Sequence, residues 1–221
     1  MIQIAEGAWQ ISVMPRQSVN CYLLGDVLVD AGIKSSGPKL LRALQGKAVS
    51  AHALTHAHPD HQGASAEICK ALNLPLFCHA DEKKATETGY VLGSFPNPKS
   101  VMARMQQRFF AGAGHPVARV LAEGDSVGGF TVIETPGHTR GHISFWRASD
   151  AVLIAGDALV GMNLFTTKPG LGLPLNVATW DMDAVRASIR KLAKLSPKRV
   201  AFGHGPAVDG TTFQRFANSL G

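Results

Sequence analysis

The chain has 221 residues, of which 45% are hydrophobic and 17% charged, and its formal net charge is +6. This length can bury one self-sufficient core, and the ordinary composition excludes fibrous and disordered classes. The positive charge permits weak attraction to polyanions, but we expect no nucleic-acid partner. The three cysteines have no zinc-finger spacing, and neither an export signal nor a membrane-spanning stretch is recognisable. We therefore expect a cytoplasmic protein without membrane contact.

The apolar pattern predicts an antiparallel opening followed by alternating strands and helices. In chain order it indicates strands over 9–13, 20–24 and 27–29, a helix over 37–45, a strand over 49–54, a helix over 64–72, a strand over 74–78 and a helix from 81. Strands are then expected over 130–135, 143–146 and 151–155, a helix over 182–195, a strand over 200–202 and a helix over 211–220. We expect one α/β domain, residues 1–221, with two sheets covered by helices.

The segment 88–116 interrupts this alternation and is interpreted as an inserted, lid-like helical segment. Its helix is expected to begin at Pro98, with Asn97 as the capping residue. Two groups of apolar residues are candidates for a substrate-facing wall, namely Met102, Met105, Phe109 and Phe110 in this segment and Phe165, Leu171, Leu173 and Leu175 in the loop 162–176. Packing as scaffold or a dimer contact are the alternatives for the insertion.

Chemistry concentrates in the run Thr55-His56-Ala57-His58-Pro59-Asp60-His61, which follows a predicted strand. A chance match to HxHxDH in a chain of this composition is expected in about one sequence in a thousand. Alternate positions of an extended loop point to one side, so His56 and His58 can bind one cation while Asp60 and His61 turn toward a second. The sequence therefore predicts a metal site.

This run resembles the signature of the metallo-β-lactamase fold hydrolases, and three further motifs follow in that family's order. The first is the sequence PGHTRGH at residues 136–142, which contains His138. The second is the apolar strand at 152–155, which is followed by Asp157, and the third is a GHG turn that contains His204. The resemblance extends from about residue 20 to residue 206. It implies a four-layer αβ/βα sandwich, in which two mixed β-sheets are flanked by helices.

The resemblance also implies a ligand set for two divalent metal ions. It assigns His56, His58 and His138 to one ion, Asp60, His61 and His204 to the other, and Asp157 to a position between them. Zinc is the first choice for imidazole and carboxylate ligands, with iron or manganese as alternatives. A metal-bridging hydroxide would attack the substrate, and Asp60 would be the catalytic residue that orients it and relays its proton.

Departures from individual branches of the family narrow the expected reaction. Asp157 stands where true β-lactamases usually have cysteine or serine, few residues follow His204 to hold glutathione, and no tyrosine closely follows Asp157 as in acyl-homoserine lactonases. We expect a hydrolase acting on the ester, thioester or lactone carbonyl of a small molecule. The alternatives are a mononuclear iron persulfide dioxygenase-like enzyme and, less favoured, a phosphodiesterase. The natural substrate and the oligomeric state stay open, with a homodimer as one option.

The remaining histidines and the cysteines have simpler interpretations. His142 is expected near the metal site, with an orienting role as one of two alternatives. A packed or surface position is expected for His52, a satisfied turn for His79 and a loop for His115. The cysteines Cys21, Cys69 and Cys78 are expected in the core.

Overall fold

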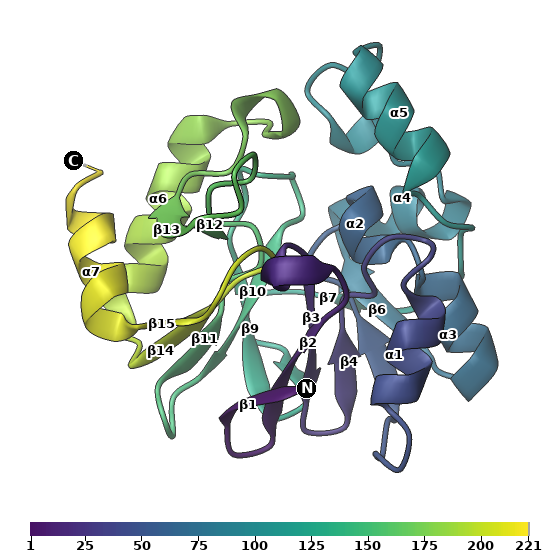
Figure 1. Cartoon of the computed structure of the whole chain (residues 1–221), viewed down its shortest axis with the longest axis horizontal. Helices are drawn as coiled ribbons and strands as arrows, with labels where there is room; N and C mark the ends of the chain where they lie inside the picture. The colour runs from purple at the N-terminus through teal and green to yellow at the C-terminus, as the bar shows by residue number, and fades with distance from the viewer. Residues whose placement is uncertain (221) are drawn as a thin grey trace.

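The computed structural model describes residues 1–220, and its strands form two large sheets and one hairpin (Figure 1). The first sheet has the order β1 (Ile2–Ala5), β2 (Ala8–Ser12), β3 (Asn20–Leu24), β4 (Val27–Val29), β5 (Ala51–Ala53), β6 (Leu76–His79) and β7 (Val117–Leu121). The second has the order β15 (Val208–Asp209), β14 (Arg199–Ala201), β11 (Val152–Ile154), β10 (Ile143–Arg147), β9 (Phe130–Glu134) and β8 (Ser126–Val127). The hairpin pairs β12 (Val160–Met162) with β13 (Pro169–Gly172).

Both large sheets are mixed, as expected. The neighbours from β1 to β4 are antiparallel, whereas β4, β5, β6 and β7 pair in parallel. In the second sheet only β11 and β14 are parallel. Parallel neighbours need crossover connections, and helices provide the connections between β4 and β5 and between β5 and β6.

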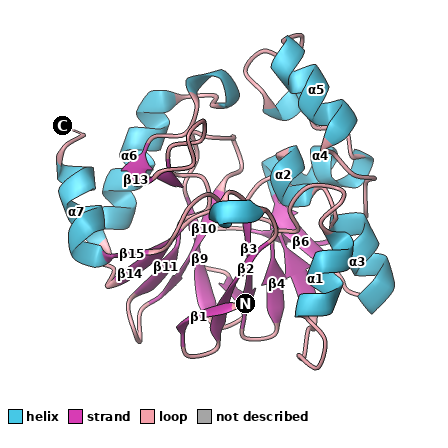
Figure 2. Ribbon diagram, in the orientation of Figure 1, coloured by secondary structure: helices cyan, strands magenta, loops and turns pink. Residues whose placement is uncertain are grey.

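Helices cover the outer faces of both sheets (Figure 2). The helices of the chain are α1 (Gly37–Ala43), α2 (Pro59–Gln62), α3 (Ser65–Leu72), α4 (Lys83–Thr88), α5 (Val101–Phe109), α6 (Met182–Lys194) and α7 (Gly210–Asn218), with short 3₁₀ turns η1 (Pro15–Gln17), η2 (Ala80–Glu82), η3 (Leu92–Ser94) and η4 (Asn176–Ala178). The helices α1 and α3 pack on the first sheet, and α6 and α7 pack on the second. The layers therefore have the expected αβ/βα order.

The strand residues alternate between two apolar layers, which explains why these short segments are almost wholly apolar. In β3, Tyr22 and Leu24 face the core between the sheets, while Cys21 and Leu23 face α1 and α3. Side chains on a strand point alternately to opposite faces, so a strand covered on both sides buries every residue. All five residues of β3 are indeed buried. The three cysteines are free and buried, as expected.

Two expectations for local structure are wrong. The helix α5 begins at Val101 rather than Pro98, because the Ser100 hydroxyl accepts the Ala103 amide as the cap. Asn97 instead closes a turn, in which its side chain accepts the Lys99 amide. The loop expected over 162–176 contains part of the hairpin, whose second strand tolerates a proline because it has only one neighbour.

The segment 88–116 lies beside the loop that precedes α6. Val91, Phe95 and Ala103 form a small apolar cluster with Ala178, separate from the three clusters of the sandwich. Both segments stand at the same end of the sheets, where α5 and the loop before α6 face one another in Figure 1. Among residues 1–220, no helix is long and apolar enough to cross a membrane.

Candidate metal centre

The HxHxDH run lies where β5 leaves the first sheet and turns into α2. Pro59 occupies the first turn of α2, where its fixed backbone angle suits the helix, and His58 stands extended before it. The loops after β9, β11 and β14 of the second sheet bring His138, Asp157 and His204 to the same place. The site is therefore built from both sheets at one common end.

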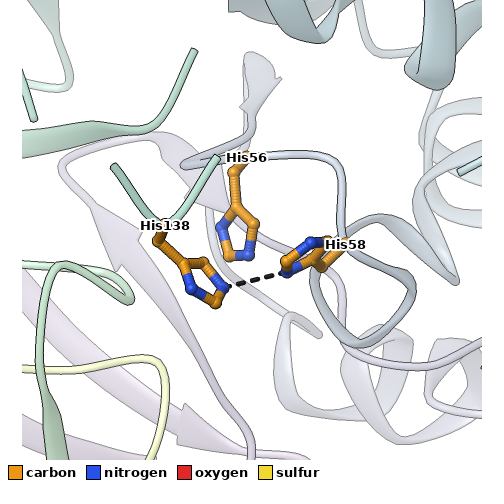
Figure 3. A group of neighbouring side chains, drawn as sticks. All are labelled: His56, His58 and His138. Carbon is orange, nitrogen blue, oxygen red and sulfur yellow. Dashed lines mark hydrogen bonds between the residues drawn. The ribbon is translucent and has the colours of Figure 1, made fainter. Parts of the chain in front are cut away.

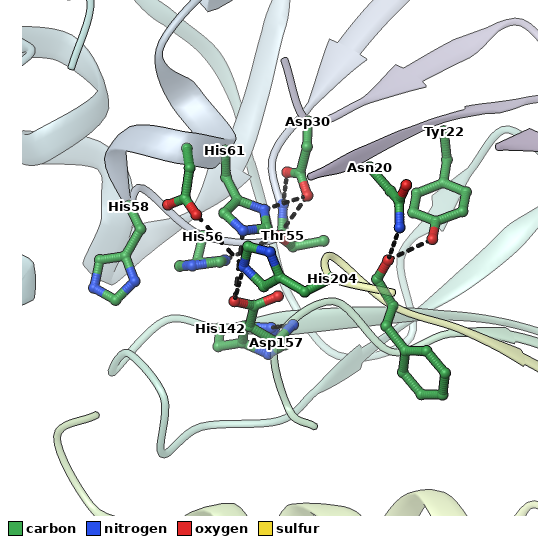
Figure 4. Close-up of polar contacts among 12 residues, drawn as sticks. Asn20, Tyr22, Asp30, Thr55, His56, His58, His61, His142, Asp157 and His204 are labelled. Carbon is green, nitrogen blue, oxygen red and sulfur yellow. Dashed lines mark hydrogen bonds and ion pairs between the residues drawn. The ribbon is translucent and has the colours of Figure 1, made fainter. Parts of the chain in front are cut away.

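The structure brings all seven predicted residues together. Their ligand atoms form three groups in which every atom lies within 4.8 Å of the others: His56, His58 and His138; His56, His61 and Asp157; and Asp60, His61 and His204. Figure 3 shows the first group converging from two loops, and Figure 4 shows His56, His61 and His204 around Asp157. Shared members connect the groups into one continuous cluster.

In the first group, an outer hydrogen bond fixes which nitrogen of each imidazole carries the proton. The carbonyl of Ser94 can only accept, so His58 donates from Nε2 over 3.2 Å and its Nδ1 is bare. Thr179 donates its hydroxyl to the Leu175 carbonyl and therefore accepts from Nδ1 of His138. The two bare nitrogens, Nδ1 of His58 and Nε2 of His138, lie 2.9 Å apart.

The protonated nitrogen of His56 is fixed in the same way, by a hydrogen bond to Thr55. The Thr55 hydroxyl donates to Asp30, so it accepts from Nδ1 of His56 at 3.0 Å. Nε2 of His56 is then bare, and it is buried without a hydrogen-bond partner among the described residues. Three lone pairs thus meet in one place, which is the arrangement that a cation needs.

The second part of the cluster surrounds the Asp157 carboxylate. Its Oδ2 lies 3.0 Å from Nε2 of His204 and 3.6 Å from Nε2 of both His61 and His138. The outer nitrogens of His61 and His204 donate to the Asp30 carboxylate and to the Ser18 carbonyl. One carboxylate oxygen therefore stands between imidazoles that belong to the two predicted metal positions.

These donors fit metal ions on two grounds. Buried polar atoms normally have partners, yet within residues 1–220 Nε2 of His61 and Oδ1 of Asp157, like Nε2 of His56, form no hydrogen bond. In addition, Gly203 leaves room for the cluster, since a Cβ there would lie only 2.1 Å from Oδ1 of Asp157. The bare imidazole nitrogens and carboxylate oxygens are the donor set of zinc, iron or manganese sites.

Electrostatics divides the cluster into two halves. Burial lowers the pKa of His56, His58 and His138 below the usual value, which keeps these imidazoles neutral. Burial also opposes charge on His204, but Asp157 outweighs it and raises the pKa of His204 to about 9. The pKa of His61 is raised as well, because Asp157 and Asp30 outweigh its burial. Cations and protons compete for the nitrogens around Asp157.

Several residues that hold the cluster were not predicted from sequence. Asp30 accepts hydrogen bonds from the Thr55 amide, the Thr55 hydroxyl and His61, each over 2.8 Å. Glu82 accepts the amides of Ala57 and Gly141, and so ties the two histidine-bearing loops together. Asp30 directly follows an apolar strand, and that position at a strand's carboxyl end was the available signal.

Among the other histidines, His142 has the orienting contact that was one of its alternatives. Its Nε2 accepts the Asp157 amide over 2.9 Å, and its Nδ1 donates to Thr135. His52 is buried in β5 between the Leu28 carbonyl and the Ser65 hydroxyl. His79 accepts the Asp81 amide as a turn residue, and His115 lies in a loop, as expected.

Comparison with known proteins gives one consistent result. The sequence-family model of the metallo-beta-lactamase superfamily matches residues 14–204 of this chain. The probable metallo-hydrolase YflN of Bacillus subtilis is 32% identical over 85% of this chain and 78% of its own length. A hydroxyacylglutathione hydrolase of Bdellovibrio bacteriovorus is 34% identical, but the match covers 49% of this chain and 34% of that enzyme.

A solved structure resembles most of the chain. TTHA1623, described in a di-iron-bound form, aligns with a TM-score of 0.71 and 32% sequence identity over 94% of this chain and 97% of its own.

Proposed function

Because the chain belongs to the metallo-beta-lactamase superfamily, we propose that it is a dinuclear metal-dependent hydrolase of small esters, thioesters or lactones. The observation that carries this proposal is the position of Asp157. Its Oδ2 lies within 3.6 Å of imidazoles from both predicted metal positions, as a bridging ligand requires. The group formed by Asp60, His61 and His204 offers ligands for a second cation beside the His56, His58 and His138 group.

Two divalent cations in such a site supply a water of lowered pKa and polarise the carbonyl that this water attacks. Five imidazoles and two carboxylates suit zinc first, with iron and manganese as alternatives. The di-iron form of TTHA1623 supports keeping iron among them. The chain's own task is to hold these ligands rigidly, which the outer hydrogen bonds to Asp30, Thr179 and the Ser94 carbonyl achieve.

Asp60 is the proposed proton-handling residue. Its side chain is 22% exposed, against 6% for Asp157, so it is the candidate carboxylate that a substrate or water can approach. Its Oδ2 lies 3.4 Å from Nε2 of His204. An accessible carboxylate at this place can orient the attacking water and receive its proton.

Two cavities, lined in part by the apolar residues expected to face the substrate, support a partly apolar substrate. One, of about 500 Å³, is bounded by the β12–β13 hairpin and includes Phe165, Leu171, Leu173 and Leu175. The other, of about 460 Å³, includes Met102, Met105, Phe109 and Phe110 on and after α5. Substrate pockets are typically apolar with few polar groups. We therefore interpret the segment 88–116 as a lid within one domain that spans residues 1–221.

Elemental analysis combined with a substrate panel tests the proposal. Protein produced without added metal should hold about two equivalents of zinc, iron or manganese and should hydrolyse members of a panel of esters, thioesters and lactones. Asp60→Ala should lower kcat/KM by about 100-fold or more, because one ligand and the proton acceptor are removed together. Asp26→Ala, in the exposed turn between β3 and β4, is the matched control.

Two results would overturn the proposal. One equivalent of iron with oxygen consumption on glutathione persulfide, and no hydrolysis, would assign the persulfide dioxygenase reaction instead. Turnover of Asp60→Ala close to that of the control would reject the role of Asp60.

A further inference from the structure

Two hydrogen bonds to the first group of imidazoles come from the loops that frame the cavities, not from the sheets. His138 donates to Thr179, in the loop before α6, and His58 donates to the carbonyl of Ser94, in the segment 88–116. By contrast, the outer partner of His61 is Asp30, which directly follows a strand of the first sheet. The loops around the cavities therefore hold part of the metal centre.

Trp180 connects these two loops. Its indole Nε1 donates to the same Ser94 carbonyl over 2.9 Å, and its amide donates to the His138 carbonyl. The ring of Phe95 stacks on His58 with 4.6 Å between centroids and an interplanar angle of 20°. The Ser94 carbonyl thus accepts one hydrogen bond from His58 and another from Trp180, whose loop also holds His138.

The hydrogen bonds of Thr179 place its hydroxyl as an acceptor for His138. Its side chain is buried, and its single hydroxyl proton is donated to the Leu175 carbonyl over 2.8 Å. The hydroxyl can therefore only accept from Nδ1 of His138, which leaves Nε2 bare and directed toward His58 and Asp157.

We propose that Thr179 and Trp180 are positioning residues for the metal ion of the His56, His58 and His138 group, an inference that rests on the metal centre proposed above. Thr179 fixes the tautomer and direction of His138, and Trp180 holds the Ser94 carbonyl against His58. The loop before α6 and the segment 88–116 are therefore coupled to one of the two metal positions. Displacing either loop weakens that position selectively.

Zinc titration of the metal-free protein against a chromophoric chelator tests this coupling. Thr179→Val keeps the side-chain shape but removes the acceptor, and it should weaken one zinc equivalent by about 10- to 100-fold. Thr179→Ser restores the hydroxyl and should recover the affinity. Trp180→Phe removes one neutral hydrogen bond and should weaken the same equivalent by about two- to tenfold. Thr131→Val, at an exposed position of β9, is the matched control.

Site assignment and folding are measured in parallel. Asp60→Asn alters the group formed by Asp60, His61 and His204. The zinc equivalent that this variant weakens is the one whose affinity Thr179→Val should leave unchanged. Thermal melting of the metal-free variants separates loss of metal binding from loss of the fold. Unchanged affinity in Thr179→Val, equal weakening of both equivalents, or no recovery in Thr179→Ser would each overturn the proposal. Failure of the unmodified protein to bind two equivalents would instead refute the metal centre itself, and the inference with it.

Discussion

Gly203 precedes His204, and its replacement by alanine tests how tightly the centre is fitted. A Cβ at this position would lie 2.1 Å from Oδ1 of Asp157 and 2.6 Å from Cε1 of His61. Carbon atoms in contact are about 3.5 Å apart, so the carboxylate must move by more than about 1 Å. The φ angle of Gly203 is not positive, so the effect is purely steric.

A displacement of about 1 Å at reacting groups costs about 100-fold in rate, and overpacking costs about 1–3 kcal/mol of stability. We expect Gly203→Ala to lose metal and to lower kcat/KM by about 100-fold or more. Metal content by elemental analysis and turnover of the best substrate measure this. Gly93→Ala is the control, because a Cβ there meets no heavy atom within 4 Å. Full metal content with turnover within threefold of the control would refute this fit.

Two further predictions concern stability. Burial lowers the pKa of His52 to about 4, below its value of 6.5 in the unfolded chain, so the unfolded state binds the proton more readily. Stability should fall as the pH drops from about 6.5 to 4, by up to about 3 kcal/mol from this residue, and urea unfolding of metal-free His52→Gln should show a shallower loss. Tyr22→Phe removes the hydrogen bond from the Tyr22 hydroxyl to the Phe202 carbonyl and should cost about 1 kcal/mol in the same assay without changing metal content, whereas an unchanged midpoint would show that this bond contributes nothing.

The sequence was informative where a function depends on contiguous residues. The HxHxDH run occupies one loop, so its members can be recognised together from their spacing alone. The strands at 20–24 and 27–29 match the structure because apolar residues are bounded there by a clear turn. The four-layer order followed from the resemblance that these motifs carry.

The residues that hold the cluster depend on contacts between distant segments. Ser94 acts through its backbone carbonyl, which every residue possesses, so no side-chain pattern could reveal it. Nothing in the sequence distinguishes Thr179 from the other threonines, because its role depends on its contact with His138 in the folded chain. The start of α5 was missed because Asn97 and Ser100 are both good caps, and only the fold decides which one precedes the helix.

The convergence of ligands from two sheets has a consequence for folding. His56 follows a strand of the first sheet, whereas His138 and Asp157 follow strands of the second. A cation shared by these residues is a cross-link between the two halves of the sandwich, and it binds only when the sheets are docked. It should therefore slow their separation, so that removing the metal shortens the lifetime of the native state even where the individual sheets are intact.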